Sequence, residues 1–177
     1  DTVISQTVMA CEILSREKVG ALIVFSREAR LEEYMRTGTP IDGQVSEQLI
    51  RNIFFPKASL HDGAMIVREG RIAAAGCVLP LSESHRLSAD LGTRHRAGVG
   101  MSEASDAVVV IVSEETGRIS VAHNGKMITY PGGSSNAAIM RWISKALPAD
   151  VSERGFLPKR IKSVQKFLLG KMKGFGL

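Results

Sequence analysis

Apolar positions along the chain fall into two kinds of pattern, continuous runs of strand length and stretches with a helical period. Residues 21–25 and 107–112 are uninterrupted apolar runs, which predict strands buried on both faces. Residues 3–18 carry an apolar side chain roughly every turn, which predicts an amphipathic opening helix. A second helix is predicted over residues 46–54, with Ser46 as its N-cap.

A β-hairpin is predicted in the middle of the chain. The apolar segments 64–67 and 72–79 are separated by Glu69-Gly70, and Gly70 accepts a positive φ at the turn. Asp62 would then stand at the start of the first strand and Leu79 at the end of its partner.

The segments around the hairpin predict shorter elements. Residues 38–43 contain Gly-Thr-Pro and Asp-Gly and predict a loop, and residues 82–91 predict a polar loop. A short helix is expected over 94–102, starting at Thr93. Two further strands are expected over 118–123 and 127–130, joined at Asn124-Gly125.

The segment Pro131-Gly132-Gly133-Ser134-Ser135 interrupts the strand pattern and predicts a domain boundary. A folded domain is expected over 1–130 and a helical C-terminal extension over 131–177. Within the extension, one helix would run from a Ser135 cap to Leu147. A second would start at Pro158, with an apolar stripe on an otherwise basic surface.

Composition and charge add an asymmetry between the two ends. The 177 residues, 44% hydrophobic and 23% charged, favour a single globular domain with a possible appendage. All 18 acidic residues lie at or before Glu153, whereas seven of the 23 basic residues follow it, so the last 24 residues carry +7 and the rest −2. Aromatic residues make up only 5%, which leaves little material for stacking on nucleic-acid bases. The tail also lacks a recognisable nucleic-acid recognition motif, so no specific nucleic acid is expected as a partner.

Cysteine usage and hydropathy bear on the compartment. Cys11 and Cys77 both lie in apolar patterns, which favours a reducing compartment without a disulfide framework or zinc site. The longest apolar run, 107–112, is too short to span a bilayer. The chain starts at Asp1 without an initiator methionine, so an anchor upstream in a longer protein is not excluded.

Two motifs place complementary charges near one another. A carboxylate such as Asp62 can hold a divalent cation or orient a sugar hydroxyl, and arginines such as Arg94 and Arg96 can bind phosphate. Each motif also has an ordinary structural reading, because Asp-Gly is a common turn dipeptide and Arg-His-Arg is common on solvated surfaces. Arg94 and Arg96 point apart on a helix, so we expect one to contact phosphate and the other to pack on a partner or an acid.

Taken together, the motifs resemble the signature of the diadenylate cyclase domain family. The resemblance rests on Asp62-Gly63-Ala64 and Gly92-Thr93-Arg94-His95-Arg96, with Leu79-Pro80-Leu81-Ser82 between them and 112–117 after them. It covers about residues 19–126 and is strongest toward the membrane-anchored, CdaA-type branch. It implies an α/β fold in which a single domain has a central mixed, twisted β-sheet flanked by helices.

The resemblance also implies roles for individual residues. Asp62, Arg94 and Arg96 would be catalytic, with Asp62 orienting or deprotonating a 3′-hydroxyl or ligating the metal beside it. A hard cation, Mg²⁺ or Mn²⁺, would be held by Asp62, with His61 and Glu115 as weaker candidates. The implied ATP-binding residues are Gly63, Ala64, Leu79, Thr93, Arg94, His95, Ser113 and Glu114, of which Gly63 would let the backbone approach the nucleotide and Leu79 would pack on adenine.

The implied reaction condenses two ATP molecules into cyclic di-AMP and two pyrophosphates. Its two equivalent bonds are most simply made across a twofold axis, which implies a homodimer. The anchored branch further implies a location at the cytoplasmic side of the cell membrane for a full-length protein, with this piece soluble. It also implies a membrane-bound regulator and a phosphoglucosamine mutase as partners. Two alternatives are a nucleotide sensor without turnover and a DNA- or membrane-associated protein acting through the basic tail.

Overall fold

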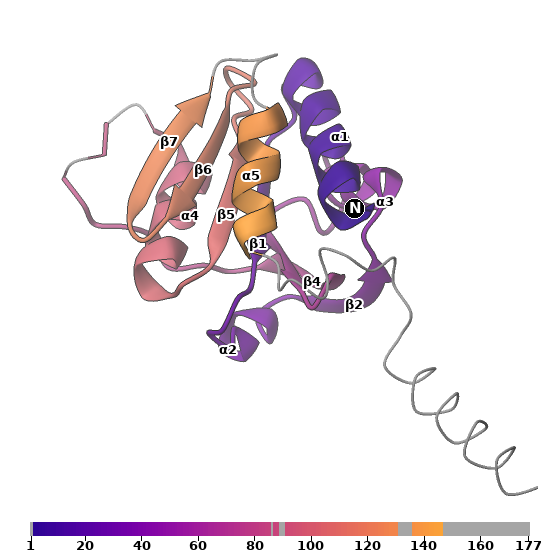
Figure 1. Ribbon diagram of the computed structural model, residues 1–177, viewed down its shortest axis with the longest axis horizontal. Helices are drawn as coiled ribbons and strands as arrows, with labels where there is room; N and C mark the ends of the chain where they lie inside the picture. Colours follow the sequence, from indigo (N-terminus) through magenta and orange to yellow (C-terminus); the bar gives the residue numbers. More distant parts are fainter. Residues whose placement is uncertain (1, 86, 89–90, 131–135, 147–177) are drawn as a thin grey trace, which may run out of the picture.

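A computed structural model of the protein describes residues 2–85, 87–88, 91–130 and 136–146. A seven-stranded mixed sheet lies at its centre, with strand order β2-β4-β3-β1-β5-β6-β7 (Figure 1). Only the β1–β3 pair is parallel, and the other five neighbouring pairs are antiparallel. The predicted α/β fold with a central mixed sheet flanked by helices is therefore confirmed. The strands are β1 (Ala21–Phe25), β2 (Thr39–Gln44), β3 (Ala64–Arg68), β4 (Arg71–Cys77), β5 (Val108–Val112), β6 (Ile119–His123) and β7 (Lys126–Tyr130).

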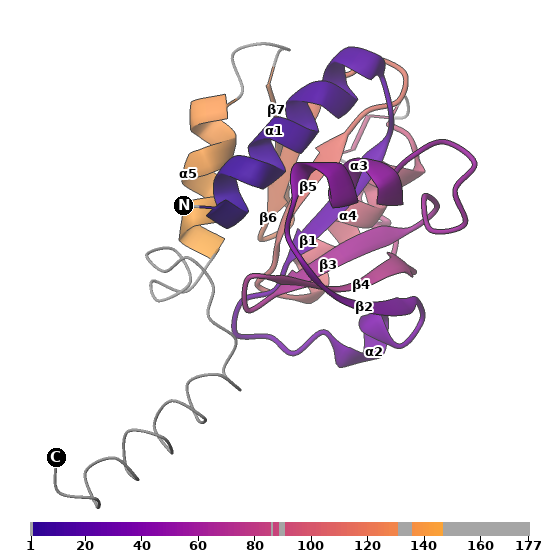
Figure 2. The same ribbon diagram turned by 90° about the vertical axis from the view of Figure 1, so that its right-hand side faces the viewer.

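Helices cover both faces of the sheet. On one face lie α1 (Thr2–Glu17), α3 (Glu47–Ile53) and α5 (Asn136–Ala146), and on the other lies α4 (Thr93–Ala104) (Figure 2). The short helix α2 (Glu32–Met35) follows β1. None of the helices in the described residues is both long and apolar enough to cross a bilayer.

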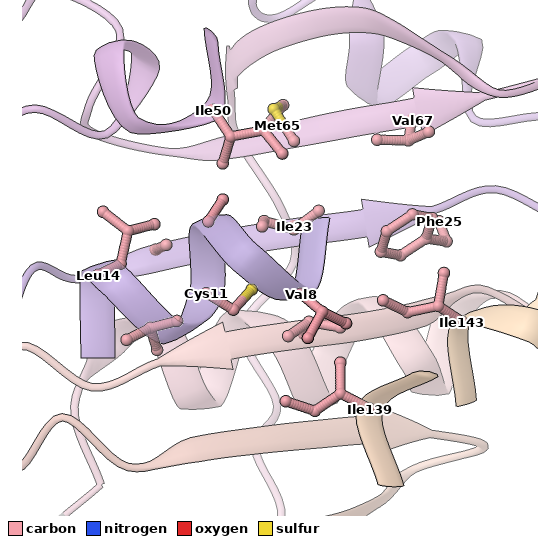
Figure 3. Packing of buried hydrophobic residues seen from close by; sticks show 14 of the residues in the cluster. Val8, Cys11, Leu14, Ile23, Phe25, Ile50, Met65, Val67, Ile139 and Ile143 are labelled. Atoms are coloured by element: carbon pink, nitrogen blue, oxygen red, sulfur yellow. The ribbon is translucent and has the colours of Figure 1, made fainter. Parts of the chain in front are cut away.

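The two faces of each central strand contribute to two separate cores. Ile23 and Phe25 of β1 face α1 and α5, while Leu22 and Val24 face the α4 side. Figure 3 shows the first core, where Val8, Cys11 and Leu14 of α1 meet β1 and β3, and Ile139 and Ile143 of α5 close one side. Because β1 is covered on both faces, all five of its residues are buried.

Most of the predicted elements are present with small shifts at their ends. The hairpin turns at Glu69 and Gly70, which both have positive φ, of 49° and 75°. Ser46 caps α3 by accepting a hydrogen bond from the Leu49 amide.

One prediction was wrong. Residues 39–44 form the edge strand β2 rather than a loop, pairing with β4 across an irregularity between Pro40 and Gly43. An edge strand needs hydrogen bonds on one side only, so it tolerates Pro40 and stays largely exposed.

Residues 131–135 and 147–177 of the C-terminal extension lie outside the described residues, and with them the predicted Ser135 cap and the final basic helix. The α5 helix, however, contributes two fully buried side chains, Ile139 and Ile143, to the same core as α1. The domain boundary at residue 130 stays a prediction.

Candidate active site

Asp62 lies in the connection that leads into β3, just before the N-terminal end of that interior strand. The residue is exposed and stands two positions before the strand. Its side chain makes no hydrogen bond or ion pair with the other described residues. A carboxylate in this position is open to a cation or to a substrate hydroxyl.

His61, beside it, is held by its own loop. Its Nδ1 lies 2.6 Å from the carbonyl oxygen of Ala58, and a carbonyl can only accept, so Nδ1 carries the proton. In the neutral ring this leaves the lone pair on Nε2 available to a metal ion or a donor.

The backbone conformation and the close packing at position 63 both require glycine. Its φ is +100°, and a Cβ there would lie 2.7 Å from the Cys77 carbonyl oxygen on β4. The strand end therefore approaches its partner more closely than any other residue would allow. Neighbouring Ala64 is 1% exposed, and its predicted contact with ATP stays a prediction.

The second motif opens α4, as predicted. Gly92 occupies the N-cap without a side-chain hydrogen bond, and Thr93 is the first helical residue. The amides of His95 and Arg96 already donate to the Gly92 carbonyl oxygen, at 3.1 and 3.3 Å. Any phosphate contact by backbone amides of this helix end would therefore fall to Thr93 and Arg94.

Arg94 reaches back from α4 to the start of β1. Its Nη1 lies 2.7 Å from Oε2 of Glu114, in a pair whose side chains are 22% and 62% exposed. Its Nε is buried and has no hydrogen-bond partner among the described residues. The guanidinium lies against Gly20, where a Cβ would come within 2.6 Å of Nη1 and 2.7 Å of Cζ.

Glu114 belongs to a tight loop between β5 and β6. The Gly117 amide donates to the Ser113 carbonyl oxygen at 2.9 Å, and the Thr116 amide donates to the Ser113 hydroxyl at 3.2 Å. The Ser15 hydroxyl of α1 donates to the Gly117 carbonyl oxygen. The loop is therefore attached to the end of α1.

His95 is the buried member of the motif. Burial lowers its pKa below the usual 6.5, the nearby Arg94 lowers it further, and the Glu115 carboxylate partly opposes both. The imidazole is thus held neutral beside the acidic loop at neutral pH.

Hydrogen bonds from Ser82 hold the segment after β4 against α4. The Ser82 amide donates to the Arg96 carbonyl oxygen at 3.0 Å, and the Ser82 hydroxyl donates to Glu103 Oε1 at 2.8 Å. The Arg96 side chain makes no ion pair with the described residues, and Leu79 is 8% exposed within the second core.

The structure therefore brings some predicted site residues into contact. Arg94 pairs with Glu114, and the charge of Glu115 acts on His95. Within the described ranges, no group of three or more His, Cys, Asp or Glu side chains is close enough to hold a metal ion. The set of His61, Asp62 and Glu115 is not assembled within one chain, and their role as metal ligands stays a prediction.

Gly20 and Ser15 were missed by sequence analysis. Neither lies in a motif, and their contacts join segments far apart in the chain, 102 residues apart for Ser15 and Gly117. A single sequence carries no signal for such contacts.

Comparison with known proteins gives consistent matches. Residues 8–127 match the family model described as DisA bacterial checkpoint controller nucleotide-binding. The chain is 49% identical to the cyclic di-AMP synthase CdaA of Bacillus subtilis over 118 residues, 67% of this chain and 43% of that protein. A diadenylate cyclase of Listeria monocytogenes is 45% identical over 116 residues, 66% of this chain and 42% of that protein. The chain thus spans less than half the length of these curated relatives.

Solved structures agree with the fold. A double mutant of DacA from Staphylococcus aureus is 44% identical, with a TM-score of 0.78 over 81% of this chain and 94% of that one. A hypothetical membrane spanning protein from Bacillus cereus is 45% identical, with a TM-score of 0.69 over 72% of this chain and 62% of that one.

Proposed function

This chain belongs to the family of DisA bacterial checkpoint controller nucleotide-binding domains, and we propose on that basis that it is a diadenylate cyclase. Two ATP molecules would be condensed into cyclic di-AMP with release of two pyrophosphates. The single observation that carries this proposal is the 49% identity to a cyclic di-AMP synthase over 118 residues.

Each of the two bond-forming steps has the same balance. The 3′-hydroxyl oxygen of one ATP attacks the α-phosphorus of the other, the bond from that phosphorus to the bridging oxygen breaks, and pyrophosphate leaves. The hydroxyl proton must be accepted, and the negative charge on the leaving group must be offset.

Asp62 is the group that we assign to the 3′-hydroxyl. Its carboxylate is exposed and has no partner among the described residues, so it can accept the proton or orient the hydroxyl. Gly63 supports this placement because it lets the strand end lie close to β4.

Arg94, Thr93, Ser113 and Glu114 are assigned to the triphosphate side. The Arg94 guanidinium forms an ion pair with Glu114 at 2.7 Å. An incoming phosphate would compete with that carboxylate for the same donors, or share them through a cation. Arg96, which has no ion pair with the described residues, is assigned to the partner chain or the leaving pyrophosphate.

The donors fit a hard divalent cation, Mg²⁺ or Mn²⁺. Asp62 and Glu115 offer exposed carboxylate oxygens, and His61 offers Nε2. Mg²⁺ is commonly held in proteins by one or two carboxylates together with substrate phosphates and water, so a three-residue cluster is not required. When bound, the cation would offset charge on the phosphates, and Asp62 would be its main protein ligand.

The partner for catalysis is proposed to be a second copy of the chain. Two identical bonds are formed, and a twofold axis between two half-sites places each 3′-hydroxyl beside the other nucleotide. The name of the Bacillus cereus relative, a membrane spanning protein, supports a membrane-anchored setting for the whole protein. A membrane-bound regulator and a phosphoglucosamine mutase remain proposed partners by family.

A direct test incubates the purified chain with ATP and either Mg²⁺ or Mn²⁺ and identifies the products by mass spectrometry. The expected result is cyclic di-AMP, with two pyrophosphates released for each molecule of cyclic di-AMP. Binding of ATP without release of pyrophosphate would instead identify a nucleotide sensor.

A further inference from the structure

We propose that the connection between α1 and β1, residues 15–20, is a positioning element for the phosphate side of the site. Gly20 would seat the guanidinium of Arg94, and Ser15 would fix the loop that carries Glu114. This inference rests on the proposed function, since it assigns a role to residues behind the same site.

The connection itself is well defined. The Val19 amide donates to the Leu14 carbonyl oxygen at 2.8 Å, and the Lys18 amide donates to that of Ser15 at 3.2 Å. Lys18 has a φ of 52°, so α1 ends in a Schellman motif with a lysine in the left-handed position. Gly20 therefore follows a fixed turn.

Gly20 provides the surface on which Arg94 lies. An added Cβ would meet Nη1, Cζ and Nε of Arg94 at 2.6, 2.7 and 3.1 Å, and no other residue is among these three nearest atoms. Contacts this short are not tolerated, so one group must move. The atoms to be displaced form the end of a flexible side chain, so the backbone can keep its place while the guanidinium moves.

Ser15 holds the other half of the pair. Its hydroxyl donates to the Gly117 carbonyl oxygen, and a Cβ at Gly117 would lie 2.4 Å from the Ser15 carbonyl oxygen. Gly117, with a φ of 72°, thus allows the loop to lie directly on the helix end. The loop is anchored three residues after Glu114.

These contacts form a continuous series that begins and ends in the connection between α1 and β1. It runs from Ser15 to Gly117, through the loop to Glu114, across the 2.7 Å ion pair to Arg94, and from Arg94 to Gly20. Displacement of either end moves a side chain assigned to the triphosphate. The cost of Gly20→Ala should therefore fall on nucleotide binding rather than on folding.

The test compares Gly20→Ala, Arg94→Lys and the double variant with wild type, using the full chain, ATP and Mn²⁺. Gly20→Ala should lower kcat/KM at least about tenfold, chiefly through a higher KM for ATP. In the Arg94→Lys background the guanidinium is absent, so adding Gly20→Ala should change kcat/KM less than about threefold. A Gly20→Ala effect below threefold, or an equal effect in both backgrounds, overturns the proposal.

Gly43→Ala is the matched control. On edge strand β2, a Cβ at Gly43 would meet Leu49 Cδ2 at 3.0 Å, with no proposed site residue among its nearest atoms. The thermal midpoint of Gly20→Ala should fall no further than that of Gly43→Ala, whose KM should match wild type. A Gly43→Ala variant with an equally raised KM would count against the proposal.

If Gly20→Ala does not fold, Ser15→Ala tests the positioning role of the connection instead, because this substitution adds no atom. It is expected to raise KM for ATP about threefold or more, and an unchanged KM overturns the role of the connection. The proposed function is judged separately by the wild-type chain. If wild type makes no cyclic product, the proposed function fails before any variant is compared.

Discussion

At the scale of single residues, a substitution of Asp62 should lower catalytic activity without lowering the stability of the fold. Its exposed carboxylate has no partner among the described residues, so Asp62→Asn should leave the thermal midpoint nearly unchanged. The amide keeps the size of the side chain but cannot accept the hydroxyl proton or hold a cation well. Formation of cyclic di-AMP should fall by roughly a hundredfold or more, the usual range for loss of a proton acceptor.

Asp42→Asn is a suitable comparison for this variant. Asp42 is also an exposed carboxylate, on the edge strand, where it pairs with Arg71. Asparagine tolerates its positive φ of 47°. Activity close to wild type is expected, and an Asp62→Asn enzyme with more than about a tenth of the wild-type rate would remove Asp62 from the chemistry.

His95 gives a prediction about pH. Burial is the main cause that holds its pKa below 6.5 in the folded protein, whereas the unfolded chain takes up a proton near 6.5. Stability from the neutral imidazole is thus fully present above pH 6.5 and is lost as pH falls toward the lower folded pKa. The thermal midpoint measured between pH 7.5 and 5 should therefore fall more steeply for wild type than for His95→Gln. Equal slopes would show that His95 does not titrate differently in the two states.

The residues of the site differ in how far sequence could predict them. Asp62 and Arg94 lie in short motifs, and the predicted strand start and helix start placed them at element ends, where the structure has them. The ion pair between Arg94 and Glu114 was not predicted as such, because the sequence did not show which of Arg94 and Arg96 would contact an acid. The seat at Gly20 depends on where α4 packs against β1, which no local pattern encodes.

At the scale of elements, the fully buried strands were the easiest to predict from the sequence. The strands β1 and β5 are buried along their whole length and appear in the sequence as continuous apolar runs. The edge strand β2 carries Pro40, Asp42 and Gly43 and pairs on one side, so its composition is that of a loop. Its pairing with β4 is a contact between separate segments, which the local pattern of residues 39–44 does not reveal.

The two halves of the C-terminal extension should behave differently when removed. A chain ended after Ala149 keeps α5, and we expect kcat/KM within about threefold of wild type, roughly 0.65 kcal/mol. A chain ended after Tyr130 loses Ile139 and Ile143, both fully buried. Exposing the core beneath two such side chains should cost about 3 kcal/mol or more, which thermal unfolding would detect.

Point variants on α5 test whether the packing of its buried side chains, rather than the shortening of the chain, accounts for the loss of stability. Ile139→Ala should destabilise the protein by about 2–5 kcal/mol, whereas Met140→Ala, at a position 40% exposed, should cost much less. Loss of the fold in the chain ended after Ala149 would mean that residues beyond it are part of the core.

At the scale of the whole molecule, the proposed reaction is most simply carried out by two copies of the chain. One described chain contains one Asp62 and one Arg94–Glu114 pair, and the product contains two equivalent phosphodiester bonds. Two half-sites related by a twofold axis supply the second set without a second motif in the sequence. The rate per chain should consequently fall on dilution as dimers separate.

A mixed dimer of wild type and Asp62→Asn chains tests this arrangement directly. If each Asp62 acts on the 3′-hydroxyl of the ATP bound in its own subunit, the mixed dimer has one competent hydroxyl and two reachable α-phosphates. It should form the first bond and fail to close the ring, so that the product is the linear dinucleotide with a terminal triphosphate. Wild-type dimers prepared with the same tags should yield mainly the cyclic product, as resolved by mass spectrometry. Mixed dimers that yield cyclic di-AMP at half the wild-type rate would mean that one subunit completes both bonds, and the symmetric mechanism would then be wrong for this protein.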